Sequence, residues 1–420
     1  MLRALIRKPH IRVKAPPMPT SQARTPATWR TRSVVAIALA SLFSDACYEL
    51  IIPLLPAFIT SLGGGPAALG LMEGLADGIA FPFKLVGGVL ADRTKRRRAW
   101  TAAGYLGVGV FMPAIALMQS VAGVVTMRAM AWAARGFRSP IRDTLLVDDT
   151  DPRFVNRAFG FQRALDTVGA VIGPALAMTL VAIGWPARNA IAVGIIPGVL
   201  AGTMYFFVRE RPRTVPPRAP LHLALGGLPP TFLRYLLAAG VFGAGNFSAT
   251  LLVLAAMRAL TPHVGAALAV TYATGLYLAH NAVQASVSYP ASVLSERIGA
   301  GRLLGVSFAL FTAVAAIVAL VPGSVIAIII AFALGAVAVA IVEPMEGTFA
   351  TELLPAERRG TGYGVLASVN GIGDFISSAG VGLLWQAFGP TVAFGCSAAV
   401  CAAGVLLLAP IVARPHVKID

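Results

Sequence analysis

Charged residues are scarce in this chain. Asp, Glu, Lys and Arg make up 12% of its 420 residues, whereas hydrophobic residues make up 57%. Soluble domains carry about 25% charged residues. The composition therefore excludes an ordinary soluble domain, and it also excludes a disordered chain. The mean hydropathy of +0.77 is typical of a protein that lies mostly within a lipid bilayer.

Cysteine is nearly absent as well. Cys47, Cys396 and Cys401 all lie inside apolar runs, so neither a disulfide framework nor a paired-cysteine metal site is indicated. The sequence also lacks a G-x-x-x-x-G-K-[ST] loop, which argues against ATP binding by a P-loop. No nucleophile–base set stands out. We therefore expect no enzymatic activity, no cofactor and no bound metal.

Twelve apolar segments follow one another along the chain. They lie at about 34–61, 67–91, 98–119, 120–140, 158–184, 188–208, 231–257, 265–293, 302–321, 324–350, 359–386 and 390–412. Each is long enough to cross the ~30 Å hydrocarbon core as a helix. Their continuous apolar character does not fit the alternating strands of a membrane barrel. The sequence therefore predicts an all-α membrane protein with twelve transmembrane helices.

Basic residues exceed acidic ones, with 34 Lys and Arg against 18 Asp and Glu, a net charge of +16. In a soluble protein this excess would suggest nucleic-acid binding. Most of it lies in alternate breaks between the apolar segments, whereas the other breaks hold only Arg188 and Arg258. Cytoplasmic loops of membrane proteins are enriched in Lys and Arg. We therefore expect both chain ends in the cytoplasm, and no nucleic-acid partner.

The longest internal break is polar, rich in proline, and follows six of the twelve segments. An internal repeat supports a division there, because a shift of the sequence by 204 positions places 43–44 on 247–248 and 92–93 on 296–297. Transporters built of two related halves are common. The predicted parts are a basic tail at 1–32, six-helix halves at 33–208 and 231–412, a linker at 209–230 and a short tail at 413–420.

The break between the second and third segments, GVLADRTKRR at 88–97, resembles the loop motif of the major facilitator superfamily (MFS). It departs from that motif at Lys95, where the family has glycine. The resemblance implies the MFS fold, from about residue 33 to 412. In the family this loop ties neighbouring helix ends together in one conformational state, which implies gating roles for Gly88, Asp92 and Arg93.

The fifth segment carries a second resemblance. Gly160, Gly169, Gly173 and Pro174 have the spacing G-x8-G-x3-G-P, similar to a motif of proton-coupled antiporters in the superfamily. Gly169 and Gly173 would let another helix approach closely, and Pro174 removes a backbone hydrogen bond and permits a bend. The resemblance implies a gating role for these residues and favours export.

Five ionisable residues lie deep in the predicted first, second and fourth helices: Asp45, Glu49, Glu73, Asp77 and Arg128. Such groups are costly in a membrane and usually mark function. Neighbouring carboxylates and an arginine alter one another's proton affinity. We interpret these residues as a proton- and substrate-coupling cluster. The alternative is a static ion-pair network that joins the three helices.

Other polar residues within the segments are candidate substrate contacts. These are Arg135, Asn246, Tyr272, Tyr277, His280, Asn281, Asn370 and Asp374. The sequence as a whole predicts a secondary transporter of the bacterial cytoplasmic membrane that exports a small organic solute or drug in exchange for protons. Uptake of a siderophore-like metal chelate or an organic anion, with Arg128 and Arg135 as contacts, is an alternative. A non-transporting sensor or scaffold on the same fold is another.

Overall fold

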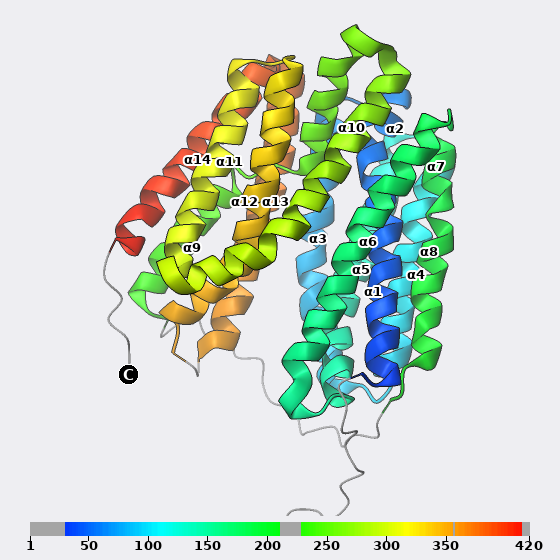
Figure 1. Cartoon of the computed structure of the whole chain (residues 1–420), viewed down its shortest axis with the longest axis vertical. Coiled ribbons are helices and arrows are strands. Elements are labelled where there is room, and N and C mark those ends of the chain that lie inside the picture. Colours follow the sequence, from blue (N-terminus) through cyan, green and yellow to red (C-terminus); the bar gives the residue numbers. More distant parts are fainter. Residues whose placement is uncertain (1–29, 211–227, 356–357, 414–420) are drawn as a thin grey trace, which may run out of the picture.

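A computed structural model describes residues 30–210, 228–355 and 358–413, and every regular element in these ranges is helical (Figure 1). Most of the predicted 1–32 tail, 209–230 linker and 413–420 tail lies outside these ranges.

The first half holds elements up to residue 207. They are α1 (Arg32–Ile51), η1 (Ile52–Leu54), α2 (Leu55–Ser61), α3 (Pro66–Arg93), α4 (Arg97–Ala114), η2 (Ile115–Leu117), α5 (Val121–Asp148), η3 (Pro152–Phe154), α6 (Val155–Ala182), α7 (Ala187–Val193), α8 (Ile195–Thr203) and η4 (Met204–Phe207). The second half holds α9 (Pro230–Gly243), α10 (Ala249–Ile298), α11 (Ala300–Leu320), α12 (Val325–Leu353), α13 (Arg359–Phe388) and α14 (Pro390–Val412).

Within the described ranges these elements form twelve membrane-spanning segments. The first combines α1, η1 and α2, and the sixth combines α7, α8 and η4. The chain reverses within α10 at Gly265, whose φ of 80° breaks the helix, so α10 contributes to two spans. Its first part continues α9 across a short non-helical stretch and completes the seventh span. The predicted all-α fold with twelve transmembrane helices is confirmed.

Two predicted boundaries are wrong. The fourth helix does not end at residue 140, because Pro140 lies inside α5, which continues to Asp148. The seventh helix is not continuous over 231–257, because it is interrupted at 244–248. Neighbouring helices can re-satisfy the backbone groups that a helix break or a proline leaves free within a membrane.

Nine of the described helices are long and apolar enough to cross a membrane by composition alone. The helices outside that set are α5, α9 and α13. Helix α5 carries Arg128, Arg135 and Arg138 in its interior, α9 is short, and α13 is rich in glycine and polar residues. Residues of α5 and α13 line the cavities described below.

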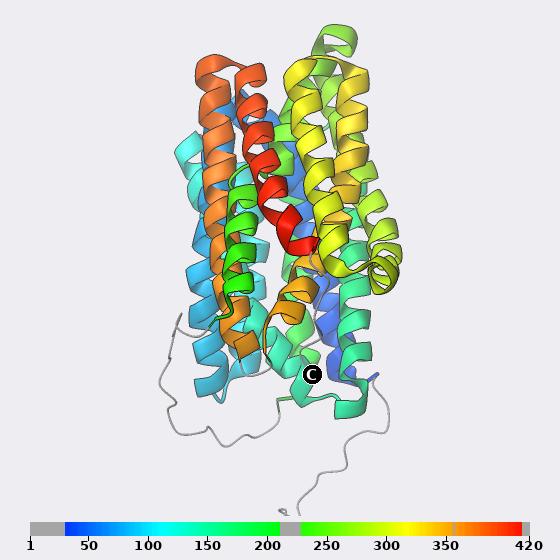
Figure 2. The ribbon, with the colours of Figure 1, turned by 90° about the vertical axis from the view of Figure 1, so that its left-hand side faces the viewer.

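The two halves lie side by side, with helices roughly along the long axis of the molecule (Figures 1 and 2). They meet where α3 packs on α13 and where α6 packs on α10. A Cβ atom at Gly70 of α3 would lie 2.2 Å from the carbonyl oxygen of Ser378 and 2.8 Å from Cα of Gly382 in α13. Glycine therefore allows the backbones of the two halves to touch at this point.

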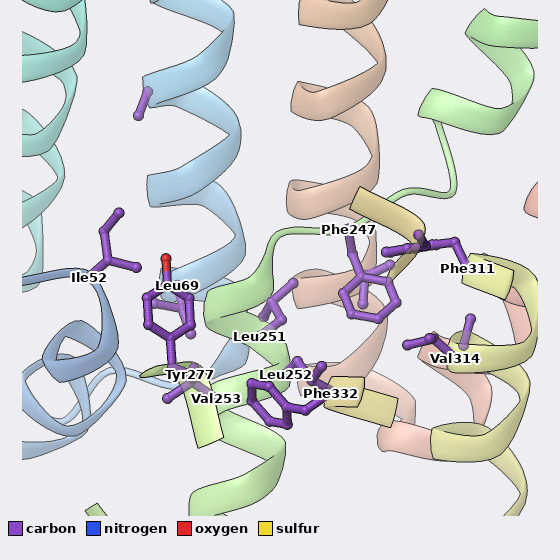
Figure 3. Packing of buried hydrophobic residues seen from close by; sticks show 14 of the residues in the cluster. Ile52, Leu69, Phe247, Leu251, Leu252, Val253, Tyr277, Phe311, Val314 and Phe332 are labelled. Atoms are coloured by element: carbon purple, nitrogen blue, oxygen red, sulfur yellow. The ribbon is translucent and has the colours of Figure 1, made fainter. Parts of the chain in front are cut away.

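A cluster of buried apolar side chains continues across the junction between the halves. Figure 3 shows part of it, including Ile52 and Leu69 of the first half and Leu251 and Tyr277 of the second. Helix α10 also packs against η1 and α2. The part of this packing around Ile52 bounds the site on the side away from the chain termini.

Candidate functional site

A cavity of about 630 Å³ lies between the halves and is lined by α1, η1, α5, α6, α10 and α12. Its polar lining comprises Asp45, Tyr48, Glu49, Trp132, Arg135, Arg163, Asp166, Thr167, Tyr277, His280, Asn281, Gln284, Ser288, Tyr289, Ser292 and Glu343. This volume is within the range of small-molecule sites, about 300–1,000 Å³.

The cavity extends from the middle of the bundle toward the end at which α1 begins and α14 ends. Arg163 follows the start of α6 at Val155 by only eight residues, and Ser292 precedes the end of α10 at Ile298 by six. Ile52 lies at the opposite limit, next to the apolar packing shown in Figure 3. The lining thus connects the helix middles with the end of the bundle that carries the chain termini.

Glu49 of α1 is bonded to the other half of the molecule. Its carboxylate Oε2 accepts hydrogen bonds from the Tyr277 hydroxyl at 2.8 Å and from Asn281 Nδ2 at 3.0 Å, both on α10. Hydrogen bonds to an ionised acceptor are about twice as strong as neutral ones. The charge on Glu49 therefore affects how strongly α1 and α10 are held together.

Asn281 has a second acceptor on α6. Its Nδ2 lies 2.9 Å from the main-chain oxygen of Ala170. In an α-helix this oxygen would accept from the backbone N–H four residues later, but that residue is Pro174, which has no N–H. The proline of the antiporter-like motif thus frees a carbonyl group on which the second half is anchored.

Asp45 lies one turn before Glu49 on α1 and lines the same cavity, with 6% of its surface exposed. Arg135 of α5 donates to the hydroxyl of Tyr48 at 2.9 Å, and its guanidinium carbon lies 4.6 Å from the centre of the Tyr48 ring. In the described part of the chain, no ion pair within 4.0 Å joins Asp45 or Glu49 to a basic side chain.

Arg128 and Glu73 form a separate, buried pair between α5 and α3. The N–O distance is 2.7 Å, and each side chain is at most 3% exposed. The Arg128 guanidinium carbon also lies 3.3 Å from the centre of the Trp132 ring. Neither charged residue lines the cavity. The predicted five-residue cluster is therefore divided, and this part of it has the geometry of the ion-pair alternative.

Asp77 lines a second cavity, of about 220 Å³, together with Asp374 of the other half. Trp132 Nε1 donates to Asp77 at 2.8 Å. Asn246, which lies in the interruption between α9 and α10, also lines this cavity. His280 belongs to the walls of both cavities and hydrogen bonds through Nδ1 to the Phe332 carbonyl at 3.1 Å. The two cavities are thus neighbours, and Ala249, His280 and Val339 line both.

Sequence reasoning missed two charged residues, Arg163 and Asp166, that line the first cavity toward the start of α6. Arg163 of α6 lies 3.5 Å from Asp166 and 3.2 Å from Glu343 of α12, so it links the two halves. Their signal was present, since Arg163 and Asp166 are ionisable residues within the predicted fifth helix. Two predicted contacts are not brought to either cavity. Tyr272 is 49% exposed, and Asn370 donates to Glu346 at 2.6 Å.

Arg97, rather than Arg93, makes the described contacts of the loop motif. Its guanidinium bonds Asp148 at the end of α5 and the Ala91 carbonyl near the end of α3, both at 2.6 Å. Arg93 is exposed and takes part in none of the ion pairs found among the described residues. The side chain of Asp92 lies outside the described part of the structure.

The glycines predicted to act in gating differ in their surroundings. A Cβ at Gly169 would lie 2.3 Å from the Leu42 carbonyl oxygen, and one at Gly173 would lie 2.7 Å from the Leu50 nitrogen. These two glycines therefore allow the close approach of α6 to α1 that the sequence predicts. A Cβ at Gly88 or Gly160 would meet nothing within 4 Å.

A family model described as Major Facilitator Superfamily matches residues 37–278 and 235–419, which together cover almost the whole chain. The chain belongs to the Major Facilitator Superfamily. The predicted MFS resemblance is therefore confirmed, and the protein is a membrane transporter rather than an enzyme. An uncharacterized MFS-type transporter of Methanocaldococcus jannaschii is 26% identical over 357 residues, which are 85% of this chain and 89% of that protein.

The multidrug resistance protein MdtG of Escherichia coli is 28% identical over 155 residues, 36% of this chain and 37% of MdtG. Among solved MFS-like structures, the nucleoside transporter NupG superposes with a TM-score of 0.73 at 11% identity, covering 92% of this chain and 100% of that one. A bacterial homologue of the lysosomal transporter Spinster, in an inward-facing and occupied conformation, has a TM-score of 0.67 at 17% identity, with coverage of 92% and 96%. These structural likenesses show the fold alone.

Proposed function

We propose that this MFS protein is a proton-coupled exporter of a small organic solute. The observation that carries the proposal is the cavity between the halves, in which Asp45 and Glu49 line the wall and form no ion pair with any basic side chain that the structure describes. A carboxylate in such a place can take up or release a proton as its surroundings change. The partial likeness to the multidrug resistance protein MdtG supports export as the direction.

The proposed mechanism is rocking of the two halves, 33–208 and 231–412, around the cavity. In the proposed orientation both chain ends lie in the cytoplasm of a bacterial cell. The cavity then leads toward the cytoplasm, and the proposal takes the present conformation as the inward-facing one. The transport cycle alternates this state with an outward-facing one, in which the α6–α10 and α3–α13 contacts are rearranged. Packed interfaces of this kind have two stable arrangements. A small shift at the cavity can therefore change the interface from one arrangement to the other.

Several charged and titratable groups lie on the same cavity wall as Glu49 and affect how readily it binds or releases a proton. They are Asp45 on α1, Arg135 on α5, Asp166 on α6, Tyr277 and His280 on α10, and Glu343 on α12. The hydrogen bonds from Tyr277 and Asn281 depend on the charge of Glu49. A change in those bonds on rocking would therefore change how strongly Glu49 binds a proton, and this links the proton to the change of state.

The proposal is tested in proteoliposomes by measuring solute-driven proton flux over a panel of cationic, neutral and anionic solutes. We expect at least one solute to drive proton flux in the native protein, and Asp45→Asn and Asp77→Asn to reduce that flux strongly. Asp143→Asn is the matched control, because Asp143 pairs with Arg142 and lies outside both cavities. Unchanged flux in both cavity variants contradicts the coupling role, and no flux with any solute supports the sensor or scaffold alternative.

A further inference from the structure

The charges on the cavity wall are unequal. The first cavity, of about 630 Å³, is called the main cavity below. Four carboxylates line it: Asp45, Glu49, Asp166 and Glu343. Two guanidinium groups, Arg135 and Arg163, oppose them among the described residues. The smaller cavity adds Asp77 and Asp374, and its lining in the described part of the chain includes no basic residue other than His280. The surface that a solute meets is therefore acidic in both cavities.

Both cavity arginines already have partners in the protein. Arg163 pairs with two of the four carboxylates, Asp166 and Glu343. Arg135 bonds the Tyr48 hydroxyl and lies over the rings of Tyr48 and Trp132, at 4.6 and 5.1 Å from their centres. Aromatic faces attract and partly compensate a guanidinium charge. The positive groups are thus engaged, while Asp45 and Glu49 lack ion-pair partners within 4.0 Å among the described residues.

The same geometry argues against an anionic solute. Arg128, an anion contact in the uptake alternative, is 2% exposed, paired with Glu73 and covered by Trp132. It cannot reach a solute in the main cavity without breaking a buried ion pair. An anion would also approach Asp45 and Glu49, and like charges brought together in a site of low dielectric repel strongly.

From these observations we infer that the substrate is an organic cation, whose positive group is held by Asp45 and Glu49 in the middle of the main cavity. The two carboxylates are one helical turn apart on α1 and face the same cavity, so one ammonium or phosphonium group can interact with both. Tyr277 and Trp132 line the cavity nearby and offer apolar contact to the rest of the solute. This inference rests on the proposed transport function.

The test is equilibrium binding of tetraphenylphosphonium to the full chain in lipid nanodiscs, with tetraphenylborate as the anion of nearly the same shape. Protein-free nanodiscs measure partition into lipid. We expect saturable binding of the cation only. Asp45→Asn and Glu49→Gln should each weaken it about tenfold or more, because each removes a charge interaction in a poorly solvated site. Asp143→Asn should leave the affinity within about twofold of the native value.

Preferred binding of tetraphenylborate, binding of neither ion, or cation binding that is unchanged in both cavity variants overturns the inference. The proteoliposome experiment separates this failure from failure of the proposed function. If only neutral or anionic solutes drive proton flux, transport stands and the substrate class is wrong. If the cation binds at Asp45 and Glu49 but no solute drives flux, the binding site stands and coupled transport is wrong.

Discussion

The side-chain nitrogen of Asn281 lies 2.9 Å from the main-chain oxygen of Ala170. That oxygen has no backbone N–H donor at position 174, four residues later in its own helix. The donor is missing because residue 174 is proline. Since the same nitrogen also bonds Glu49, one amide joins α10 to both α6 and α1 at the cavity. Pro174 therefore contributes to the contact between the halves as well as to the shape of its helix.

Pro174→Ala restores the N–H that competes for the Ala170 oxygen. We expect it to weaken the bond from Asn281 and to lower the population of the present conformation about fivefold, the equivalent of one hydrogen bond of about 1 kcal/mol. Electron–electron distance measurements between spin labels on α6 and α10 report this population. In an Asn281→Leu background the same substitution should have little effect.

Pro290→Ala in α10 is the control for that experiment, since Pro290 lines neither cavity and takes part in no hydrogen bond between helices in the described part of the chain. If Pro174→Ala lowers the population of the present conformation equally in the Asn281→Leu background, the link between Pro174 and Asn281 is contradicted.

The buried pair of Arg128 and Glu73 should determine stability. Glu73→Ala leaves the Arg128 charge without its partner in a site that is 2% exposed. Removing one partner of a buried pair typically costs about 3–5 kcal/mol, whereas replacing both with apolar residues is often neutral. We therefore expect a large fall in the thermal unfolding temperature for Glu73→Ala and recovery of most of it in Glu73→Leu/Arg128→Met. A single variant as stable as the native protein would contradict this assignment.

Gly169→Ala and Gly160→Ala form a matched pair within one helix. At Gly169 the added methyl group would meet the backbone of α1 at 2.3 Å, so α6 and α1 must separate. Such overpacking typically costs about 1–3 kcal/mol. At Gly160 nothing lies within 4 Å, and alanine should be neutral or stabilising by up to about 1 kcal/mol. Thermal unfolding of the two variants in detergent measures the difference, and equal effects would exclude a special role for the α1–α6 contact.

Arg97→Gln and Arg93→Gln remove the same charge from the two sides of one loop, because α3 ends at Arg93 and α4 begins at Arg97. Only Arg97 bonds Asp148 and the Ala91 carbonyl, at 2.6 Å each. We expect Arg97→Gln to reduce the initial transport rate several-fold by loosening the ends of α3 and α5, and Arg93→Gln to have a small effect. In a double-mutant cycle, Asp148→Asn should add little to Arg97→Gln. Independent, additive effects would mean that the pair is not coupled.

Much of the fold could be predicted because it depends on features of the sequence itself, namely the length of apolar segments and a local motif. The length of the apolar segments indicates the number of spans, and the loop motif at 88–97 predicts the family, which the family model confirms. Helix ends were harder, because proline is tolerated inside membrane helices. The sequence predicts that the fourth segment ends at residue 140, whereas α5 continues through Pro140 to Asp148, and the interruption at 244–248 carries no clear signal.

The site could be predicted in part for a similar reason. Sequence position indicates how deep a charge lies in the membrane, and Asp45 and Glu49 do line the main cavity. It does not indicate which neighbour the side chain meets. Glu73 and Asp77 are one turn apart, yet the first pairs with Arg128 and the second bonds Trp132 beside another cavity. In the basic run at 93–98, only the tertiary position of Asp148 distinguishes Arg97 from Arg93.

The central claim is that the carboxylates of the main cavity exchange a proton for the solute. The most direct measurement is proton release on binding of tetraphenylphosphonium to the purified protein in weakly buffered solution, recorded across a pH series. We expect the native protein to release protons within a defined pH range, because the bound cation favours the ionised carboxylates. The Asp45→Asn/Glu49→Gln variant, at ligand concentrations that compensate for its weaker binding, should release none. Equal release by both proteins, or saturable binding to the native protein without release at any pH, would contradict the account.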